Sequence, residues 1–245
     1  MKVTVLGKYG PYPPAGGNCS GYLLEGNKTK ILMDCGNGTF SQLQKYTNYW
    51  EIDAIVLSHL HMDHVSDCFV ARYAFESAIA REKRKLPLDI HTLTEPQEVY
   101  GLLGHKNVFH TWPIKPYGEI ELGDLRLGFL PTVHSKICCA IKVECNNKVL
   151  VYSADTEYFE GLVDFIRGSD LFICESSYLS QDLEYDFYNH MASFQAGQLA
   201  RKGQVKRLKL THLHPEKPED ILLSEAKAEF ENTELVKEGE VIEVK

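Results

Sequence analysis

The segment IDAIVLSHLHMDH, residues 52–64, runs from apolar side chains directly into four that can bind a metal. These four are His59, His61, Asp63 and His64. The apolar part predicts a strand, which projects alternate residues to one side, and a turn into a helix brings the last of the four back toward the others. We therefore expect the side chains to converge on a metal. Imidazole and carboxylate ligands without thiolates suit zinc, and less exclusively manganese or iron.

The composition of the whole chain is that of a compact globular protein, with 44% hydrophobic and 24% charged residues among 245. The 34 acidic and 26 basic side chains give a formal net charge of −8, so no global positive field attracts a phosphate backbone. The start MKVTVLGKYG lacks the apolar run of a signal peptide, and no stretch approaches the roughly 18 apolar residues that span a bilayer. We expect a cytoplasmic protein without membrane association.

Short apolar and β-branched runs alternate with amphipathic stretches along the chain. Strands are expected at about residues 2–6, 21–25, 29–34, 52–58, 88–93, 125–132, 137–145, 149–154, 170–174 and 205–211. Helices are expected over residues 41–50, 67–85, 157–168, 192–203 and 218–230. No repeat or polar linker marks an internal boundary, so we expect one domain over residues 1–245, with layered sheets covered by helices.

The cysteines and the glycines have simpler interpretations. The seven cysteines form no CxxC pair, and most lie in apolar runs, as Cys35 and Cys174 do. They are therefore expected to be small buried thiols. The Pro- and Gly-dense residues 10–21 predict a turn-rich loop.

The sequence SHLHMDH resembles the HxHxDH signature of the metallo-β-lactamase superfamily, and further motifs match that family in chain order. His134 in LRLGFLPTVH is similar to the family's next ligand histidine, Asp155 in VLVYSADT to its bridging aspartate, and His212 in LKLTHLH to its final histidine. Asp34 in ILMDCG resembles the early aspartate that supports the site from behind. The resemblance covers essentially the whole chain. It implies an α/β fold, the four-layer αββα sandwich, with a binuclear site along the edge between its sheets.

Carried over by position, the resemblance divides the ligands between two divalent ions, with zinc expected and manganese or iron as alternatives. It implies that His59, His61 and His134 hold one ion, that Asp63, His64 and His212 hold the other, and that Asp155 bridges them. A water held between two such ions ionises near neutral pH and becomes a hydroxide nucleophile. Asp63, which is expected to be a ligand, is also expected to be a catalytic residue.

The remaining histidines have no such match. His214 lies two residues after His212 and is expected to face solvent or the rim of a cleft. His91, His105 and His110 match no motif and are expected to be structural.

Two further residues resemble the ribonuclease Z branch of the superfamily. Glu175 follows the strand in LFICESSY, and His190 precedes a helix in NHMASFQAGQLA. In that branch an acidic residue and a histidine form a pair that contacts the scissile phosphate and helps the leaving oxygen depart. A protonated imidazole held by a carboxylate can donate to an alkoxide. The sequence leaves open whether the pair forms, the alternative being a surface histidine and a glutamate that caps the core.

The chain departs from ribonuclease Z between its third and fourth motifs. That family inserts a long Gly/Pro-rich arm there to grip transfer RNA, whereas the sequence predicts a single strand hairpin between His134 and Asp155. With the acidic balance, this makes a large structured RNA a poor candidate and favours small phosphodiesters: cyclic nucleotides, cyclic sugar phosphates or short oligonucleotides. The basic run at 81–85 is expected to be a solvated helix end.

Two other functions stay open at this point. The first is hydrolysis of a lactone, carboxylic ester or thioester at the same binuclear site. The second, a non-hydrolytic redox protein, is disfavoured because the di-iron relatives carry glutamate where this chain has His61, together with a flavin domain. The oligomeric state is also open, and a homodimer is compatible with the sequence.

Overall fold

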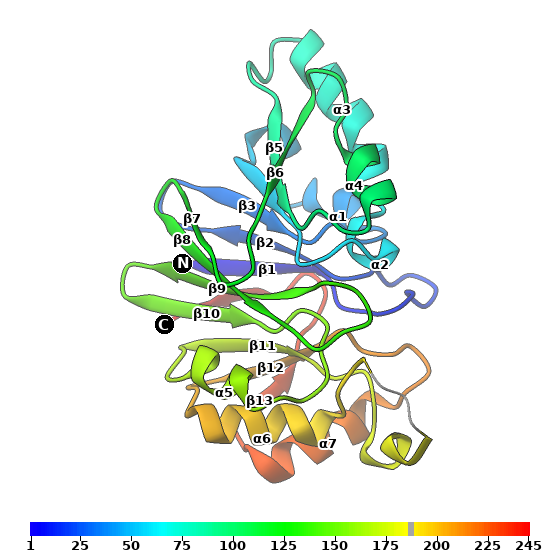
Figure 1. The fold of residues 1–245 in the computed structure, drawn as a ribbon, viewed down its shortest axis with the longest axis vertical. Coiled ribbons are helices and arrows are strands. Elements are labelled where there is room, and N and C mark those ends of the chain that lie inside the picture. The colour runs from blue at the N-terminus through cyan, green and yellow to red at the C-terminus, as the bar shows by residue number, and fades with distance from the viewer. Residues whose placement is uncertain (186–188) are drawn as a thin grey trace.

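Two seven-stranded sheets pack face to face in the computed structural model, which describes residues 1–185 and 189–245 (Figure 1). The first sheet has the order β14-β1-β2-β3-β4-β5-β6. Its strands are β1 (Lys2–Gly7), β2 (Gly21–Glu25), β3 (Lys30–Met33), β4 (Ala54–Val56), β5 (Leu88–Thr92), β6 (Phe109–Pro113) and β14 (Val241–Glu243). Strands β3 to β6 are parallel to one another, and the other pairs are antiparallel.

The second sheet has the order β13-β12-β11-β10-β9-β8-β7. Its strands are β7 (Glu119–Leu122), β8 (Leu125–Pro131), β9 (Cys139–Cys145), β10 (Lys148–Tyr152), β11 (Leu171–Glu175), β12 (Leu208–Thr211) and β13 (Thr233–Leu235). Strands β10 to β13 are parallel, while β9 is antiparallel to both β8 and β10. Strand β8 therefore points the same way as β10, so all these parallel strands end at one edge.

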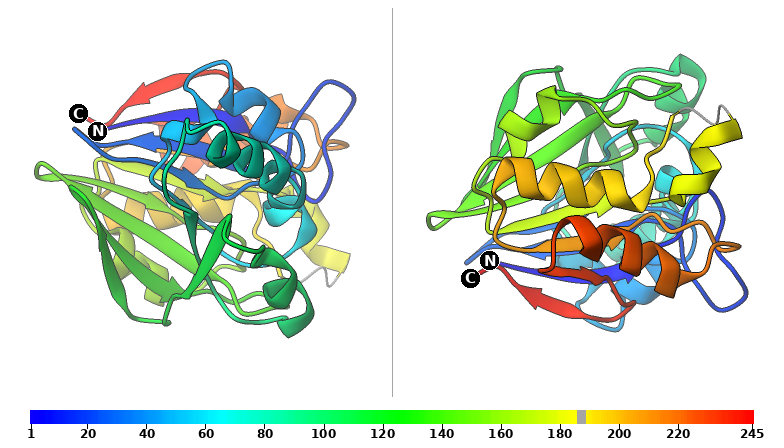
Figure 2. Two further views of the ribbon diagram at one scale, coloured as in Figure 1. Left: turned by 90° about the horizontal axis from the view of Figure 1, so that it is seen from above. Right: turned by 90° about the horizontal axis from the view of Figure 1, so that it is seen from below.

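Helices cover the outer face of each sheet. Those of the first sheet are α1 (Thr39–Leu43), α2 (Met62–Val65), α3 (Cys68–Ala80) and α4 (Gln97–Leu103). Those of the second are α5 (Gly161–Ile166), α6 (Ser193–Gly203) and α7 (Glu219–Glu229), and Figure 2 shows α6 and α7 side by side. Short 3-10 turns span Tyr49–Glu51 and Ser180–Tyr185.

The hydrophobic core divides into the three interfaces of a four-layer molecule. Apolar side chains from both sheets, such as Val5 and Ile141, form the central cluster. A second cluster lies between the first sheet and its helices, where Phe75 of α3 is fully buried. The third lies under α5, α6 and α7 and includes Leu199. The expected αββα sandwich is confirmed.

The turns of the two sheets are joined at the edge opposite the carboxyl ends of the parallel strands. Asp124, in the turn between β7 and β8, accepts hydrogen bonds from the backbone N–H groups of Asn27 (2.6 Å) and Thr29 (3.1 Å) in the turn between β2 and β3. Burial opposes ionisation of Asp124, but hydrogen bonds from Thr29 and from the backbone of Asn27 and Lys28 outweigh it and lower the pKa of this carboxyl to about 2. One carboxylate thus ties the two sheets together.

Several local expectations were wrong. The long helix ends at Ala80 rather than at residue 85, because the backbone at Glu82 is left-handed (φ 57°). The basic run at 81–85 is exposed after the helix end, as expected, except at Arg84, whose guanidinium donates to the carbonyl oxygens of Trp50 (3.0 Å) and Ile52 (2.7 Å). The helix expected over 41–50 is divided between α1 and a 3-10 turn.

Other features agree with the sequence or add to it. All seven cysteines are free and buried, as expected. Strands β6, β7, β13 and β14 and helix α4 were not predicted. In the part of the chain that the structure describes, no helix has both the length and the apolar character needed to cross a membrane.

Candidate active site

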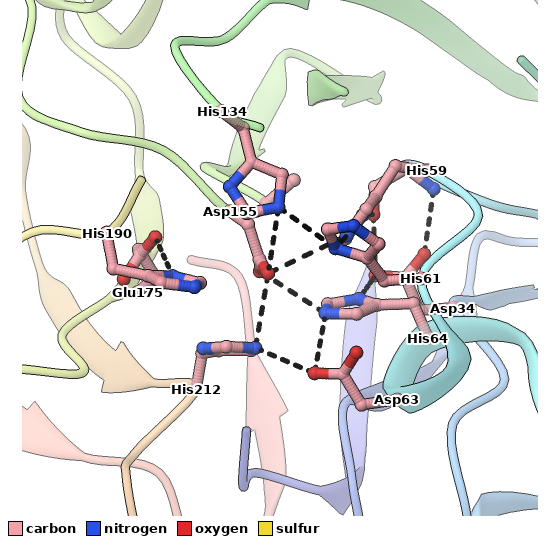
Figure 3. A network of polar contacts seen from close by, with 12 residues as sticks. Asp34, His59, His61, Asp63, His64, His134, Asp155, Glu175, His190 and His212 are labelled. Carbon is pink, nitrogen blue, oxygen red and sulfur yellow. Dashed lines mark hydrogen bonds and ion pairs between the residues drawn. The ribbon is translucent and has the colours of Figure 1, made fainter. Parts of the chain in front are cut away.

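The carboxyl ends of six strands bring the predicted site residues to one edge between the sheets (Figure 3). Strands β3 and β4 come from the first sheet, and β8, β10, β11 and β12 from the second. They end at or shortly before Asp34, His59, His134, Asp155, Glu175 and His212, respectively. The helical turn α2 then carries Asp63 and His64 back to the same edge. Residues far apart in the sequence converge because parallel strands present their carboxyl ends together.

Three imidazoles and one carboxylate form what we call the first half-site: His59, His61, His134 and Asp155. The Nδ1 atom of His61 lies 3.1 Å from Nε2 of His59 and 3.0 Å from Nε2 of His134. An Asp155 oxygen lies 3.7 Å from His59 Nε2 and 3.8 Å from His134 Nε2. Burial lowers the pKa of both His59 and His61, which favours the neutral imidazoles that can bind a cation.

Two carboxylates and two imidazoles form the second half-site: Asp63, His64, Asp155 and His212. His212 Nε2 lies 3.2 Å from an oxygen of Asp63 and 3.3 Å from one of Asp155. His64 Nε2 lies 3.3 Å from the other oxygen of Asp155. Burial would lower the pKa of His64, but Asp155 and Asp63 beside it raise that pKa well above its usual range. Asp155 belongs to both half-sites.

Unsatisfied buried atoms test whether these residues fit a metal. His64 Nε2 and Asp155 Oδ1 are buried and, although only 3.3 Å apart, are not oriented to hydrogen bond with each other or with any other described residue. Buried polar atoms usually have partners, and an imidazole nitrogen and a carboxylate oxygen are both ligand atoms that divalent cations bind. Within each half-site the ligand atoms lie within 4.8 Å of one another. The residues present therefore fit the metal centre that the sequence predicts.

Asp34 supports the site from the core. Its Oδ2 atom accepts from Nδ1 of His64 (2.7 Å) and from the hydroxyl of Tyr152 (3.0 Å). Its carboxylate also accepts from the backbone N–H (2.8 Å) and the hydroxyl (2.9 Å) of Ser58, and Ser58 in turn contacts His59 Nδ1 at 3.1 Å. These bonds direct Nε2 of both imidazoles toward the cluster, as outer partners of metal ligands do.

Asn189 plays the same part for His134. The Nδ1 atom of His134 lies 2.8 Å from the backbone carbonyl oxygen of Asn189, to which it donates when Nε2 is free for a cation. The backbone of Asn189 has a φ of 92° and its N–H donates to Glu157 at 2.8 Å. Asn189 was not predicted from the sequence, although its position beside His190 was a signal.

Glu175 and His190 lie in contact beside the second half-site. His190 Nδ1 is 2.9 Å from Glu175 Oε1, and its ring stacks on that of His212 with centroids 5.1 Å apart. Burial would lower the pKa of His190, but the Glu175 carboxylate outweighs it and raises the pKa to about 9. Glu175 is fully buried and also accepts from the backbone N–H groups of Thr156 (2.6 Å) and Met191 (3.3 Å). Glu175, His190 and His212 also have the spacing of a metal site, but these bonds already occupy the carboxylate.

Two glycines allow the backbone to approach the site closely. A Cβ atom on Gly10 would lie 2.0 Å from Nε2 of His212. One on Gly36 would lie 1.9 Å from the backbone oxygen of Asp63. Neither position tolerates a side chain without displacing a residue of the second half-site. Gly10 belongs to the loop that the sequence predicted over 10–21, but nothing in the sequence connects it with His212.

A cavity of about 500 Å³ opens over both half-sites. His190 lines it together with His61, Asp63, His134 and Asp155. The other lining residues, which the sequence analysis did not single out, are Pro11, Met62, Ser135, Tyr178 and Asn189. A small molecule in this cavity would reach the metal cluster and the His190 ring at once.

The remaining histidines lie outside both half-sites. His214 packs edge-on against Tyr12, with ring centroids 5.7 Å apart, near the loop that carries Pro11. His91 lies in β5, and His110 in β6 lies 4.0 Å from Asp89.

The chain is similar to proteins of one family over most of its length. The model of the "Beta-lactamase superfamily domain" matches residues 29–213. The "Probable metallo-hydrolase YhfI" of Bacillus subtilis is 32% identical over 230 residues, which cover 94% of each chain. A ribonuclease Z of Clostridium perfringens is 32% identical over 223 residues, which cover 87% of this chain but 63% of that protein.

Solved structures show the same similarity in three dimensions. The crystal structure of the metallo-beta-lactamase fold protein YhfI from Bacillus subtilis superposes with a TM-score of 0.94 at 31% identity, and the match covers 98% of both chains. The short form of human tRNase Z superposes with a TM-score of 0.77 at 20% identity and covers both chains completely. At that identity the second similarity concerns the fold alone.

Proposed function

The chain belongs to the metallo-β-lactamase superfamily and is a metal-dependent hydrolase, and on this premise we propose that it hydrolyses small phosphodiesters. The substrates we have in mind are cyclic nucleotides, cyclic sugar phosphates or short oligonucleotides. One relative at 32% identity, from Clostridium perfringens, is named a ribonuclease, and ribonucleases cleave phosphodiester bonds. This relative supports the substrate class.

The observation that carries the proposal is the hydrogen-bonded pair of His190 and Glu175 beside the metal cluster. The bond at 2.9 Å engages Nδ1 of His190, so Nε2 remains to face the cavity that the ring lines. An imidazolium held in this way can donate a proton to the departing oxygen of a diester. The leaving alkoxide of a phosphodiester needs such a donor, because it is a strong base.

The two half-sites define where the cations would be held. His59, His61 and His134 would hold one ion, Asp63, His64 and His212 the other, and Asp155 both. Divalent ions held there would supply a water of lowered pKa as the nucleophile and would offset the charge of the phosphodiester. The chain itself orients the ligands through Asp34 and Asn189 and excludes bulk water from the buried side of the cluster.

The segment between His134 and Asp155 supports a small substrate. It consists of the hairpin of β9 and β10, whose strands pair directly from Ile141–Tyr152 to Cys145–Lys148. No additional element lies between these two strands to grip a folded RNA. The cavity of about 500 Å³ suits a ligand of nucleotide size.

One observation favours hydrolysis of a lactone, carboxylic ester or thioester as a second candidate. Among the described residues that line the cavity, none is Lys or Arg. A neutral ester would need no such cation, whereas a phosphodiester must have its charge offset by the metals and the His190 imidazolium alone.

A substrate panel separates the two candidates. With zinc or manganese restored, the protein should hydrolyse bis(p-nitrophenyl) phosphate faster than p-nitrophenyl phosphate, because the diester carries one negative charge fewer. It should also cleave cyclic nucleotides, which have an alkoxide leaving group. A preference of several orders of magnitude for lactones or thioesters would instead assign the second function and leave His190 without its role.

A further inference from the structure

Ser177 contacts both His212 of the second half-site and Glu175, the partner of His190. It lies two residues beyond the end of β11 and is almost fully buried. Its hydroxyl oxygen is 3.1 Å from Oε2 of Glu175 and 3.0 Å from Nδ1 of His212. It is also 2.9 Å from the backbone carbonyl oxygen of His212. No motif points to this serine, and its contacts arise because β11 and β12 are neighbours.

The chemistry of His212 fixes the direction of its hydrogen bond with Ser177. His212 directs Nε2 toward Asp63 and Asp155, so that nitrogen is the one available to a cation. A neutral imidazole then carries its proton on Nδ1 and donates it to Ser177. The serine hydroxyl has one proton of its own, which it can give to Glu175 or to the carbonyl oxygen of His212.

We propose that Ser177 is a positioning residue that couples the second half-site to the pair of His190 and Glu175. When its hydroxyl donates to Glu175, an unbroken chain of hydrogen bonds runs from His212 through Ser177 and Glu175 to His190. Hydrogen bonds in a buried chain polarise one another. A cation on His212 makes its Nδ1–H a stronger donor, which strengthens the bond from Ser177 to Glu175 and fixes the carboxylate that holds His190.

A neighbouring serine supplies a matched control for this role. Ser176 is also buried, but its hydroxyl donates to the backbone oxygen of Thr211 at 3.5 Å and not to Glu175 or His212. Ser176→Ala and Ser177→Ala each remove one buried hydroxyl from the same turn. A role limited to filling space in this segment would make the two variants alike.

The first test measures metal affinity and needs no substrate. Competition titrations with Zn²⁺ should show that Ser177→Ala binds one of two ions about 10- to 100-fold more weakly, the usual effect of removing an outer partner of a ligand. The other ion should bind as in the wild type, and Ser176→Ala should retain both affinities. Equal affinities in the two variants, or equal weakening of both ions in Ser177→Ala, would overturn the proposal.

The second test measures coupling to His190 and rests on the proposed function. At saturating Zn²⁺, Ser177→Ala should lower kcat more for a cyclic nucleotide than for bis(p-nitrophenyl) phosphate, and should add little to the loss in His190→Ala. Additive losses, or equal losses on both substrates, would show that Ser177 acts independently of His190 and would overturn the coupling. A wild-type protein that cleaves neither diester would reject the phosphodiesterase function, while the Zn²⁺ titration still decides whether Ser177 positions His212.

Discussion

The imidazole ring of His190 lies stacked on that of His212, with 16° between the ring planes and 5.1 Å between the centroids. The His212 ring is a candidate metal ligand, and the His190 ring is held by a buried carboxylate and lines the cavity over the two half-sites. A substrate bound at the cations would thus have a proton donor at its side. The geometry therefore separates metal binding from proton transfer, and each can be tested by its own substitution.

The first prediction concerns His190. His190→Ala should keep its metals but lower turnover of a diester with an alkyl leaving group by about a hundredfold or more, within the range of a lost general acid. The loss should be smaller for a nitrophenyl diester, because nitrophenolate departs with little protonation. Steady-state kinetics on the two substrates, with metal analysis, checks this. His110→Ala, which removes an exposed histidine of β6, serves as the control. Loss of metal, or full activity on the alkyl diester, would contradict the assignment.

A second prediction concerns the number of ions. Reconstituted protein should contain about two divalent ions per chain, because the ligands form two groups that share Asp155. His64→Ala should lose mainly one of them, since His64 belongs to one group alone. Elemental analysis after removal of loosely bound metal measures both values. Only trace metal in the wild type, or unchanged content in His64→Ala, would be incompatible with the binuclear site.

Gly10 provides a third test, in which no metal-binding residue is substituted. In Gly10→Ala the new methyl group would lie 2.0 Å from Nε2 of His212, so the ring must move away from the cluster. We expect the affinity for one ion to fall by about 10- to 100-fold, as for other changes that disturb ligand orientation. Gly101→Ala is the control, because a Cβ there meets no atom within 4 Å. Wild-type Zn²⁺ affinity in Gly10→Ala would show that the ring is not held where the structure has it.

The fourth prediction concerns Asp124 and the dependence of stability on pH. Its pKa of about 2 lies below the value of about 3.9 for an unfolded aspartate, so ionisation favours the folded state. This stabilisation is complete above pH ~4 and is lost as the pH falls toward ~2. Because the side chain is partly exposed, we expect Asp124→Asn to lower the free energy of unfolding by about 1 kcal/mol at neutral pH, less than the full shift implies.

Urea denaturation of both proteins between pH 7 and pH 3 measures this difference. The gap between wild type and Asp124→Asn should narrow as the pH falls below 4. Asp164→Asn, at an exposed helix position, should show no comparable gap. A gap that stays constant over the whole range would mean that the ionised carboxylate of Asp124 is not what joins the turns.

Periodic and motif signals explain which parts of this molecule the sequence could predict. Buried strands such as β11 read as apolar runs, and the αββα sandwich was implied by the resemblance of the metal-binding motifs to those of the superfamily. The edge strands β6 and β7 escaped prediction because they are short and partly exposed, so they carry no apolar run. The end of α3 was also misplaced, since Arg84 binds carbonyl oxygens of a distant segment, a contact that no local pattern encodes.

The candidate site shows the same division. The seven expected metal-binding residues fall into two groups in space, because each stands at a strand end or in the turn after one. The pairing of Glu175 with His190 was left open by the sequence, and the structure brings their side chains to 2.9 Å. Ser177 and Gly10 were missed, because their importance lies in contacts between neighbouring strands and loops and not in their residue types.

The contact between His212 and Asp63 spans 149 positions of the chain. A nascent chain that has emerged from the ribosome only as far as β11 therefore presents the cluster at 59–64 but lacks His212. A cation that arrives then can meet only a partial set of ligands, and the complete centre forms after β12 has joined the second sheet. Loading of the second half-site should thus report that β12 has joined the second sheet. Because a cation that binds the folded chain also holds elements of the two sheets together, chelation should lower the resistance of the whole protein to unfolding.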